Sequence, residues 1–149
     1  MERCTIQAVV VVIAAVWLGA AQATVYQDCG STADIHEFSL SYCEVPPCIV
    51  HRPSNYDVNI TFTPTSAASK LETIIIATIS GVDFPWPGPE GCSQLENDVC
   101  PLQIGHKYKY SAFMPVLVEY PAISVVVQWK LKDENDVIHF CAMFPITIV

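Results

Sequence analysis

The sequence predicts an all-β fold, an immunoglobulin-like antiparallel β-sandwich of about seven strands. Apolar and polar residues alternate with a period of two through several segments, which is the pattern of half-buried strands. Clusters of Pro, Gly, Asn and Asp separate these segments, and no stretch has the periodicity of a helix of three turns. Six or seven such strands in residues 24–149 have the proportions of an immunoglobulin-like sandwich.

The first 23 residues have the features of a signal peptide. Arg3 lies in a short polar start, and an unbroken apolar run follows from Ala8 to Ala21. The run is shorter than the ~20 residues that span a bilayer, and it suits the h-region of a signal peptide. The run ends in Ala21-Gln22-Ala23, the small-x-small pattern that signal peptidase cleaves. We therefore expect a secreted mature chain that forms one domain, residues 24–149.

Six segments of the mature chain are expected to form strands. Residues 56–63 alternate most strictly, with Tyr56, Val58, Ile60 and Phe62 on one face. The expected strands, in order, are 35–42, 56–63, 71–79, 108–114, 123–131 and 138–148. The first and third are recognised by their β-branched and aromatic residues rather than by alternation.

The segment Phe84–Pro89 alternates aromatic residues or glycine with proline. It is expected to be extended and stiff, and prolines exclude it from a central ladder. One interpretation is a rigid connection between two strands. The other is one lip of an apolar opening, because Phe84 and Trp86 on a stiff loop are suited to covering apolar surface.

Cysteine usage also indicates secretion. Cys4 lies in the expected signal peptide, which leaves six cysteines and fifteen possible sets of three disulfides. Spacing favours one set, because Cys43 and Cys48 are close in sequence, as are Cys92 and Cys100. Cys29 then pairs with Cys141. The absence of any CxxC pair and the scattered histidines make a zinc site a poorer interpretation.

The mature chain is acidic, with the same formal net charge of −8 as the full sequence, since the first 23 residues contain one Glu and one Arg. This charge argues against nucleic acid as a partner and against docking on anionic membranes at neutral pH. The four histidines, His36, His51, His106 and His139, would offset about half of it near pH 5. They are expected to be ordinary surface residues, and the alternative is that they sense pH.

No catalytic motif is found: the sequence lacks GxSxG, HExxH and a glycine-rich phosphate loop. Every mature cysteine has an expected partner, which argues against a cysteine nucleophile as well. We therefore expect a protein that is not an enzyme and needs no metal or cofactor. Asn59-Ile60-Thr61 is an N-glycosylation sequon, and Asn59 falls on the polar face of its strand.

Short motifs across the whole mature chain resemble the family of the soluble secreted Niemann-Pick type C protein (epididymal secretory protein), part of the ML, or lipid-recognition, domain family. The motifs are Asp28-Cys29-Gly30-Ser31, Pro47-Cys48, Tyr56-x-Val58-Asn59-x-Thr61-Phe62-Thr63, Phe84-Pro85-x-Pro87, Gly91-Cys92, Cys100-Pro101, Pro115-Val116, Glu119-Tyr120-Pro121, Val126-Val127-x-Trp129-x-Leu131-x-Asp133 and Phe140-Cys141. The six-cysteine spacing and the Trp129 strand make the resemblance specific.

This resemblance implies a seven-stranded sandwich with an internal apolar ligand pocket between its sheets, and the same three disulfides. It implies binding of cholesterol and its transfer to a membrane protein of late endosomes and lysosomes. The pocket residues of the family correspond to Phe84, Val116 and Tyr120, with Pro115 beside Val116.

The sequence also departs from the mammalian pattern near the expected pocket. Trp86 replaces an aliphatic residue, Leu117 and Val118 replace polar ones, and Ala142 and Met143 replace a Trp and an acidic residue. We include Trp86, Ala142 and Met143 among the expected ligand-binding residues. The changes remove one large ring and favour flexible fatty-acid-like ligands as well as sterols.

The function that we expect is carriage of a sterol or fatty-acid-like lipid and its transfer to a membrane or receptor. The setting is either intracellular sterol transport in the endosome–lysosome lumen or extracellular carriage of fatty acids and semiochemicals. An alternative is a lipid-sensing protein of innate immunity that presents lipid to a receptor. The third hypothesis is a secreted structural sandwich with a fully packed core, which would bind no lipid. The protein is expected to be a monomer.

Overall fold

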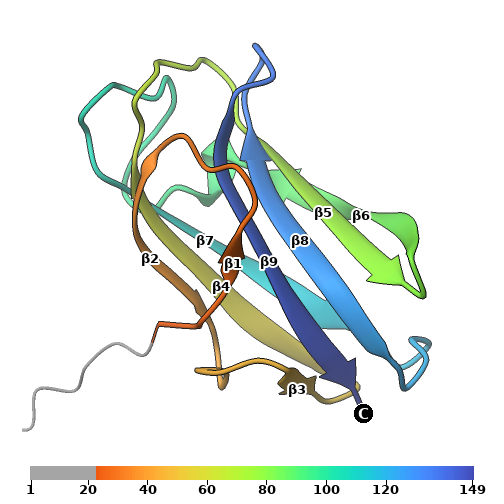
Figure 1. Ribbon diagram of the computed structural model, residues 1–149. Helices are drawn as coiled ribbons and strands as arrows, with labels where there is room; N and C mark the ends of the chain where they lie inside the picture. The colour runs from red at the N-terminus through yellow and green to blue at the C-terminus, as the bar shows by residue number, and fades with distance from the viewer. Residues whose placement is uncertain (1–22) are drawn as a thin grey trace, which may run out of the picture.

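The computed structural model describes residues 23–149, which form two β-sheets packed face to face (Figure 1). Apart from Ala23, the expected signal peptide lies outside the described residues. The strands are β1 (Gln27–Asp28), β2 (Asp34–Leu40), β3 (Cys48–Val50), β4 (Ser54–Thr63), β5 (Glu72–Ile79), β6 (Val82–Glu90), β7 (Tyr108–Val116), β8 (Ser124–Lys132) and β9 (Ile138–Ile148). Seven of these strands have seven residues or more, which confirms the predicted sandwich.

The larger sheet has the strand order β1-β9-β8-β5-β6, and β3 also pairs with β9. Its pairs are antiparallel except for β3 and β9, which run parallel. The smaller sheet has the order β2-β4-β7 and is antiparallel throughout. All six predicted strand segments are therefore strands, with ends that differ by a few residues.

The long strand that sequence reasoning did not predict is β6, which contains the aromatic and proline segment; the short strands β1 and β3 were not predicted either. β6 pairs with β5, with Trp86 opposite Ile75 and Phe84 opposite Ala77. An interpretation as a simple connection is therefore wrong. Because β6 is the edge of the sheet, one side of its backbone needs no partner, and prolines are tolerated there.

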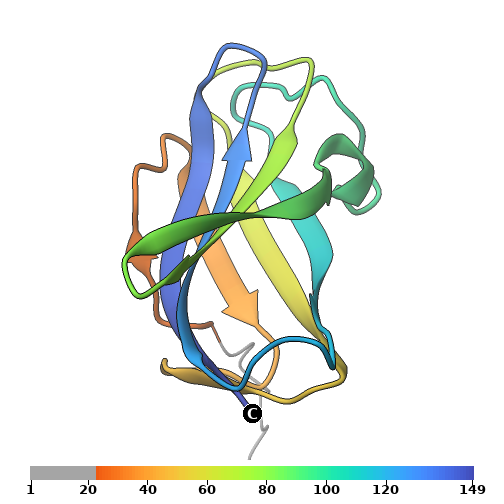
Figure 2. The ribbon, with the colours of Figure 1, turned by 90° about the vertical axis from the view of Figure 1, so that its right-hand side faces the viewer.

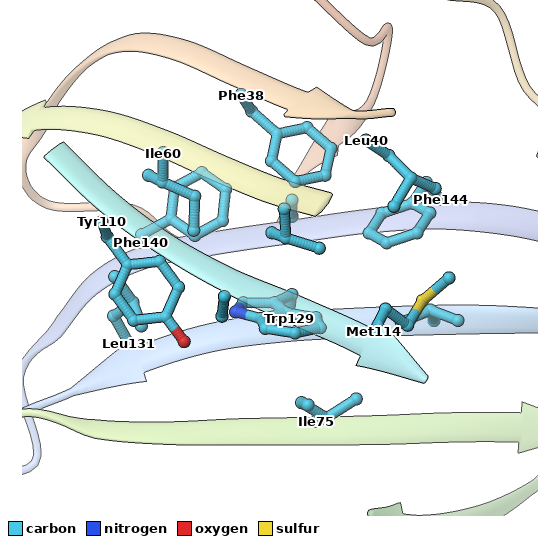
Figure 3. Close-up of a cluster of buried hydrophobic side chains, with 14 of the residues drawn as sticks. Phe38, Leu40, Ile60, Ile75, Tyr110, Met114, Trp129, Leu131, Phe140 and Phe144 are labelled. Carbon is cyan, nitrogen blue, oxygen red and sulfur yellow. The ribbon is translucent and has the colours of Figure 1, made fainter. Parts of the chain in front are cut away.

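The core lies between the two sheets and is formed by the apolar residues of the alternating pattern. In β8, for example, alternate residues from Val125 to Leu131 are buried. Figure 3 shows the largest of these side chains, with Trp129 between Tyr110 and Met114 along the strands. The Phe38 ring packs against those of Phe140 and Phe144, with centroids 5.6 and 5.3 Å away. The alternation therefore buries one face of β4, β7 and β8 and leaves the other partly or fully exposed to solvent.

All three predicted disulfides are present. Cys43–Cys48 and Cys92–Cys100 close local loops, with sequence separations of 5 and 8. Cys29–Cys141 joins the N-terminal segment to β9 across a separation of 112. Within the described part of the chain, the only helical element is a 3₁₀ turn at Cys92–Gln94, and no helix is long and apolar enough to span a membrane.

Candidate functional site

An apolar cavity of about 260 Å³ opens beside β6, at the end of the sandwich where β7 leads into β8. Four strands of the larger sheet, β5, β6, β8 and β9, and the loop between β7 and β8 form its wall. The lining residues are Ala77, Ile79, Phe84, Pro85, Trp86, Tyr120, Pro121, Ile123, Val125, Ile146 and Ile148. None of them carries a formal charge at neutral pH, and Tyr120 is the one titratable residue in the set.

The position of β6 creates one wall of this cavity. Phe84 pairs with Ala77, so both side chains face the inner side of the sheet. Phe84 nevertheless has 50% of its surface exposed, whereas Ala77 has 8%. The opposing sheet therefore leaves the β6 edge uncovered. Figure 2 views this edge, with β6 in front of the other strands and the 117–123 loop below it.

The loop of residues 117–123 forms the opposite wall and carries Tyr120. The Tyr120 and Trp86 rings meet edge to face, with centroids 5.0 Å apart, so the contact joins the loop to β6. Arg52 fixes the loop: its Nη1 donates to the Tyr120 carbonyl oxygen, and its Nε donates to the Val149 carbonyl oxygen at 3.3 Å. Burial, followed by the nearby Glu119 carboxylate, raises the pKa of the Tyr120 phenol.

Exposed apolar residues surround the opening. Val82 precedes Phe84 on β6, and Leu117 and Val118 begin the loop opposite, with 56%, 46% and 64% of their surfaces exposed. Chemically the site offers apolar surface and aromatic rings, and its lining provides no nucleophile, no acid–base pair and no metal ligand. Such a site is suited to holding an apolar molecule.

The cavity is slightly smaller than a usual ligand pocket, which has a volume of about 300–1,000 Å³. A lipid as large as a sterol or a long acyl chain therefore requires further space. The packed rings of the core close the sandwich beyond the cavity, so that space must come from movement of inward side chains or of the sheets.

The structure brings three of the seven expected ligand-binding residues together: Phe84, Trp86 and Tyr120 line the cavity. Val116 and Ala142 are buried and face the interior, but they lie outside the lining. Both are candidates for contact only if the cavity extends inward.

The structure does not bring Pro115 and Met143 to this opening. Pro115 precedes the inward Val116, and Met143 follows the inward Ala142. Neighbouring residues of a strand face opposite sides of the sheet, so Pro115 and Met143 face outward. Met143 lines a separate hollow on the outer face of the larger sheet, together with Val25, Val45 and Pro145. The motifs identified this part of the chain, but only the strand register decides which residue faces inward.

Sequence reasoning missed several lining residues, notably Ala77, Ile123, Val125 and Ile146. The period-two pattern did place Ile123, Val125 and Ile146 on the apolar faces of their predicted strands, whereas Ala77 lies in a segment that was recognised without alternation. It carried no signal for which end of each strand lies at the opening, because that depends on pairing between distant segments.

The predicted glycosylation site lies away from the cavity. Asn59 is on the outer face of β4, with its Oδ1 2.6 Å from the hydroxyl of Ser111, and its glycosylation stays a prediction. Among residues 23–149, no group of three or more His, Cys, Asp or Glu side chains is placed to hold a metal ion.

Comparison with known proteins gives consistent matches. A sequence profile of the ML domain matches residues 23–148. The mouse (Mus musculus) NPC intracellular cholesterol transporter 2 is 36% identical over 144 residues, which cover 95% of each chain. The bovine (Bos taurus) protein of the same name is 35% identical over 124 residues, 83% of each chain.

A solved structure has the same fold. The crystal structure of a Niemann-Pick type C2 protein from the Japanese carpenter ant has a TM-score of 0.74 and 28% sequence identity. The match covers 84% of this chain and 99% of that chain. Both the sequence and the arrangement of strands are therefore shared over nearly the whole described chain.

Proposed function

The chain belongs to the ML-domain family, and from this premise we propose that it is a lipid carrier that holds one sterol or fatty-acid-like molecule in the cavity beside β6. One observation carries the proposal: apolar and aromatic side chains line the cavity, and the exposed apolar residues Val82, Leu117 and Val118 form a rim around its opening. The NPC intracellular cholesterol transporter 2 proteins of mouse and cow support the same class of ligand.

The rim supports transfer of the ligand to an acceptor. Val82, Leu117 and Val118 expose apolar surface around the opening, where a lipid would leave. Exposed apolar surface on a protein in water often marks a site of contact with a membrane, another protein or a ligand. The acceptor is a membrane or a receptor, and the carrier acts outside the cell or in the endosome–lysosome lumen. We also propose that it acts by binding alone, without catalysis, and as a monomer.

The test compares two alanines that both face the interior. Ala77 lines the cavity, whereas Ala112 on β7 is 5% exposed and lies outside the lining. Ala77→Leu fills the cavity, so displacement of a fluorescent sterol and of a fluorescent fatty acid should show greatly weakened binding with little loss of stability. Ala112→Leu overpacks the core, which costs about 1–3 kcal/mol, and its folded fraction should keep binding.

The opposite pattern would contradict the carrier proposal. A packed sandwich predicts that wild type binds neither probe and that the two variants are destabilised alike in thermal unfolding. Lipid extraction of the natively secreted protein followed by mass spectrometry would then find no ligand. Co-purification of lipid-loaded protein with a receptor ectodomain would favour presentation to a receptor as the route of delivery.

A further inference from the structure

The end of the sandwich where the cavity opens, here called the open end, exposes apolar residues beyond those of the rim. β9 ends there, because its Ile146 and Ile148 line the cavity. β3 pairs with this part of β9, and the Ile148 N–H donates to the Ile123 carbonyl oxygen of the 117–123 loop at 3.0 Å. Figure 1 shows β3 beside the C-terminus at the lower end of the molecule. The chain that leads into β3 therefore lies at the open end.

Residues 42–49, here called the disulfide loop, carry three exposed apolar side chains. Tyr42, Val45 and Ile49 have 95%, 71% and 51% of their surfaces exposed. The Cys43–Cys48 bond closes this loop, and both of its cysteines are buried. A closed loop that still leaves three large apolar side chains in water has the character of a contact surface.

The N-terminal segment holds the disulfide loop in place. The buried Thr24 hydroxyl accepts the Leu40 N–H at 2.8 Å and donates to the Cys43 carbonyl oxygen. The Val25 N–H donates to the Glu44 carbonyl oxygen at 2.8 Å. Contacts on both sides of Tyr42 thus fix the direction in which its ring points.

The backbone of Tyr42 is in an unfavourable conformation. Its φ is 61°, in the left-handed region that a residue with a large side chain seldom adopts. The ring gains little burial in return, since it meets only the edge of the Tyr56 ring, with centroids 6.4 Å apart. Strain of this kind is concentrated at functional sites, so it indicates that the outward ring has a use.

The backbone of the disulfide loop offers few hydrogen-bond donors. Pro46 and Pro47 have no N–H group, and the Cys43 N–H donates to the Leu40 carbonyl oxygen at 3.1 Å. An unpaired N–H group is costly in an apolar environment, so their scarcity lowers the cost of entering a bilayer. A protein partner would instead benefit from such donors. The loop is therefore better suited to a lipid surface.

All five lysines of the chain lie away from the open end. β7 begins directly after Lys107 and runs toward the open end, whereas β8 runs away from it to the β8–β9 turn. The Lys70 N–H donates to the Glu134 carboxylate of that turn at 3.1 Å. The lysines at this far end are Lys70, Lys107, Lys109, Lys130 and Lys132.

The open end is acidic instead. Glu44, Asp83 and Glu119 are exposed there. Arg52 is the one arginine among residues 23–149, and its guanidinium donates to two carbonyl oxygens of the protein. Clusters of Lys and Arg attract anionic lipid headgroups, and the open end has no such cluster. Its charge therefore matches an uncharged bilayer better than an anionic one.

We propose that the disulfide loop is a membrane contact: Tyr42, Val45 and Ile49 enter the interface of an uncharged bilayer and hold the open end against it. Tyrosine is favoured at this depth, because its ring is apolar and its hydroxyl reaches the headgroups. The inference rests on the proposed carrier function, since the bilayer is then the surface at which the cavity exchanges its lipid.

The experiment measures co-flotation of the secreted protein with phosphatidylcholine vesicles at pH 7.4. Val45→Ser should weaken the association about fivefold and Tyr42→Ser about tenfold, because each removes apolar surface that the bilayer buries. Wild type should bind less well when phosphatidylserine replaces part of the phosphatidylcholine at low salt.

The matched control is Val99→Ser. Val99 is 73% exposed and lies in the other loop closed by a local disulfide, Cys92–Cys100. That loop is at the lysine end, since the Glu96 N–H donates to the Lys109 carbonyl oxygen at 2.8 Å. This variant should bind the vesicles as wild type does.

Tyr42→Trp and Val99→Trp give a second measurement, which serves if the serine variants fail to fold. Brominated phosphatidylcholine quenches a tryptophan that enters the bilayer. It should quench the fluorescence of the tryptophan added at position 42 and not that of the one added at position 99.

Two results would overturn the inference alone. Equal vesicle association of wild type, Val45→Ser and Tyr42→Ser would leave the loop to a protein partner. Light scattering that shows a dimer for wild type and a monomer for Tyr42→Ser would mean that a second copy covers the loop.

Displacement of a fluorescent fatty acid without vesicles tests the carrier function separately. The three serine variants should bind the probe as wild type does, because Tyr42, Val45 and Val99 do not line the cavity. A wild type that binds vesicles through the loop but binds no probe would contradict the carrier function and leave the membrane contact standing.

Discussion

At the scale of single residues, Asp133 and His139 form a fully buried carboxylate–imidazole contact, so the expectation that the histidines are surface residues is wrong for His139. His139 Nε2 lies 2.8 Å from Asp133 Oδ2, with both side chains inaccessible to solvent. Asp133 Oδ1 also accepts the backbone N–H groups of Asn135 and Val137. Burial raises the pKa of Asp133, but the hydrogen bonds from His139, Val137 and Asn135 outweigh it, and the pKa is lowered overall. The carboxylate thus fixes the turn that joins β8 to β9.

The lowered pKa of Asp133 predicts how stability depends on pH. A carboxyl whose pKa is lower in the folded state stabilises the protein above its unfolded pKa, near 3.8, and loses this contribution as pH falls through the folded pKa. Asp133→Asn should lower the free energy of unfolding by about 3 kcal/mol at pH 7 and flatten its decline below about pH 4. Denaturant unfolding at several pH values measures both effects.

Asp136→Asn is the control in the same turn, because Asp136 is exposed and its pair with Lys132 is on the surface. It should cost less than about 1 kcal/mol at any pH. Equal losses for the two variants would show that the buried pair contributes no more than a surface pair.

At the scale of elements, the cavity depends on two segments that face each other, β6 and the loop 117–123. Arg52 connects that loop to the C-terminal Val149 through two carbonyl acceptors. Hydrogen bonds from a charged donor contribute about 1.5–3 kcal/mol. We therefore expect Arg52→Gln to loosen the loop and to raise the rate of ligand dissociation roughly tenfold, measured by stopped-flow displacement.

Lys70→Gln removes an exposed cation without touching the loop and should leave the dissociation rate unchanged. An unchanged rate in Arg52→Gln would mean that the Trp86–Tyr120 contact alone holds the loop. A rate raised equally in both variants would point to net charge rather than to the position of Arg52.

The same elements show what sequence alone could predict. Strict alternation identified β4, β7, β8 and β9, because burial of one face imposes a period of two wherever a sheet is half covered. The segment of β6 has no such period, and its prolines argued against a ladder. Only its place at the sheet edge, which depends on pairing with β5, makes it a strand.

The site was predicted less completely than the fold. Phe84, Trp86 and Tyr120, which line the cavity, were included because aromatic residues next to proline stand out in the sequence, and Phe84 and Tyr120 also match the family motifs. Met143 was placed with Ala142, although neighbours on a strand face opposite sides.

At the scale of the whole molecule, a disulfide links the larger sheet to the N-terminal segment near one edge, whereas the opposite edge, β6, is not covered by the smaller sheet. The Cys29–Cys141 bond closes almost the entire described chain, a constraint of about 4–5 kcal/mol in the chain-entropy model. It joins β9 to the N-terminal segment at β1, whereas β6 is at the opposite edge of the same sheet. Opening of the β6 edge to admit a lipid therefore need not disturb the disulfide-linked side.

The net charge of the molecule predicts how salt affects delivery of its ligand. With a formal charge of −8, the protein is repelled by anionic membranes, and added salt screens that repulsion. Transfer of a fluorescent lipid to anionic vesicles should therefore become faster as salt increases from low to physiological concentration. Transfer to uncharged vesicles, measured alongside, should change little. Acidification toward pH 5 should act in the same direction as salt, because it reduces the net negative charge of the protein. A rate that falls with salt would instead require a basic surface that contacts the membrane.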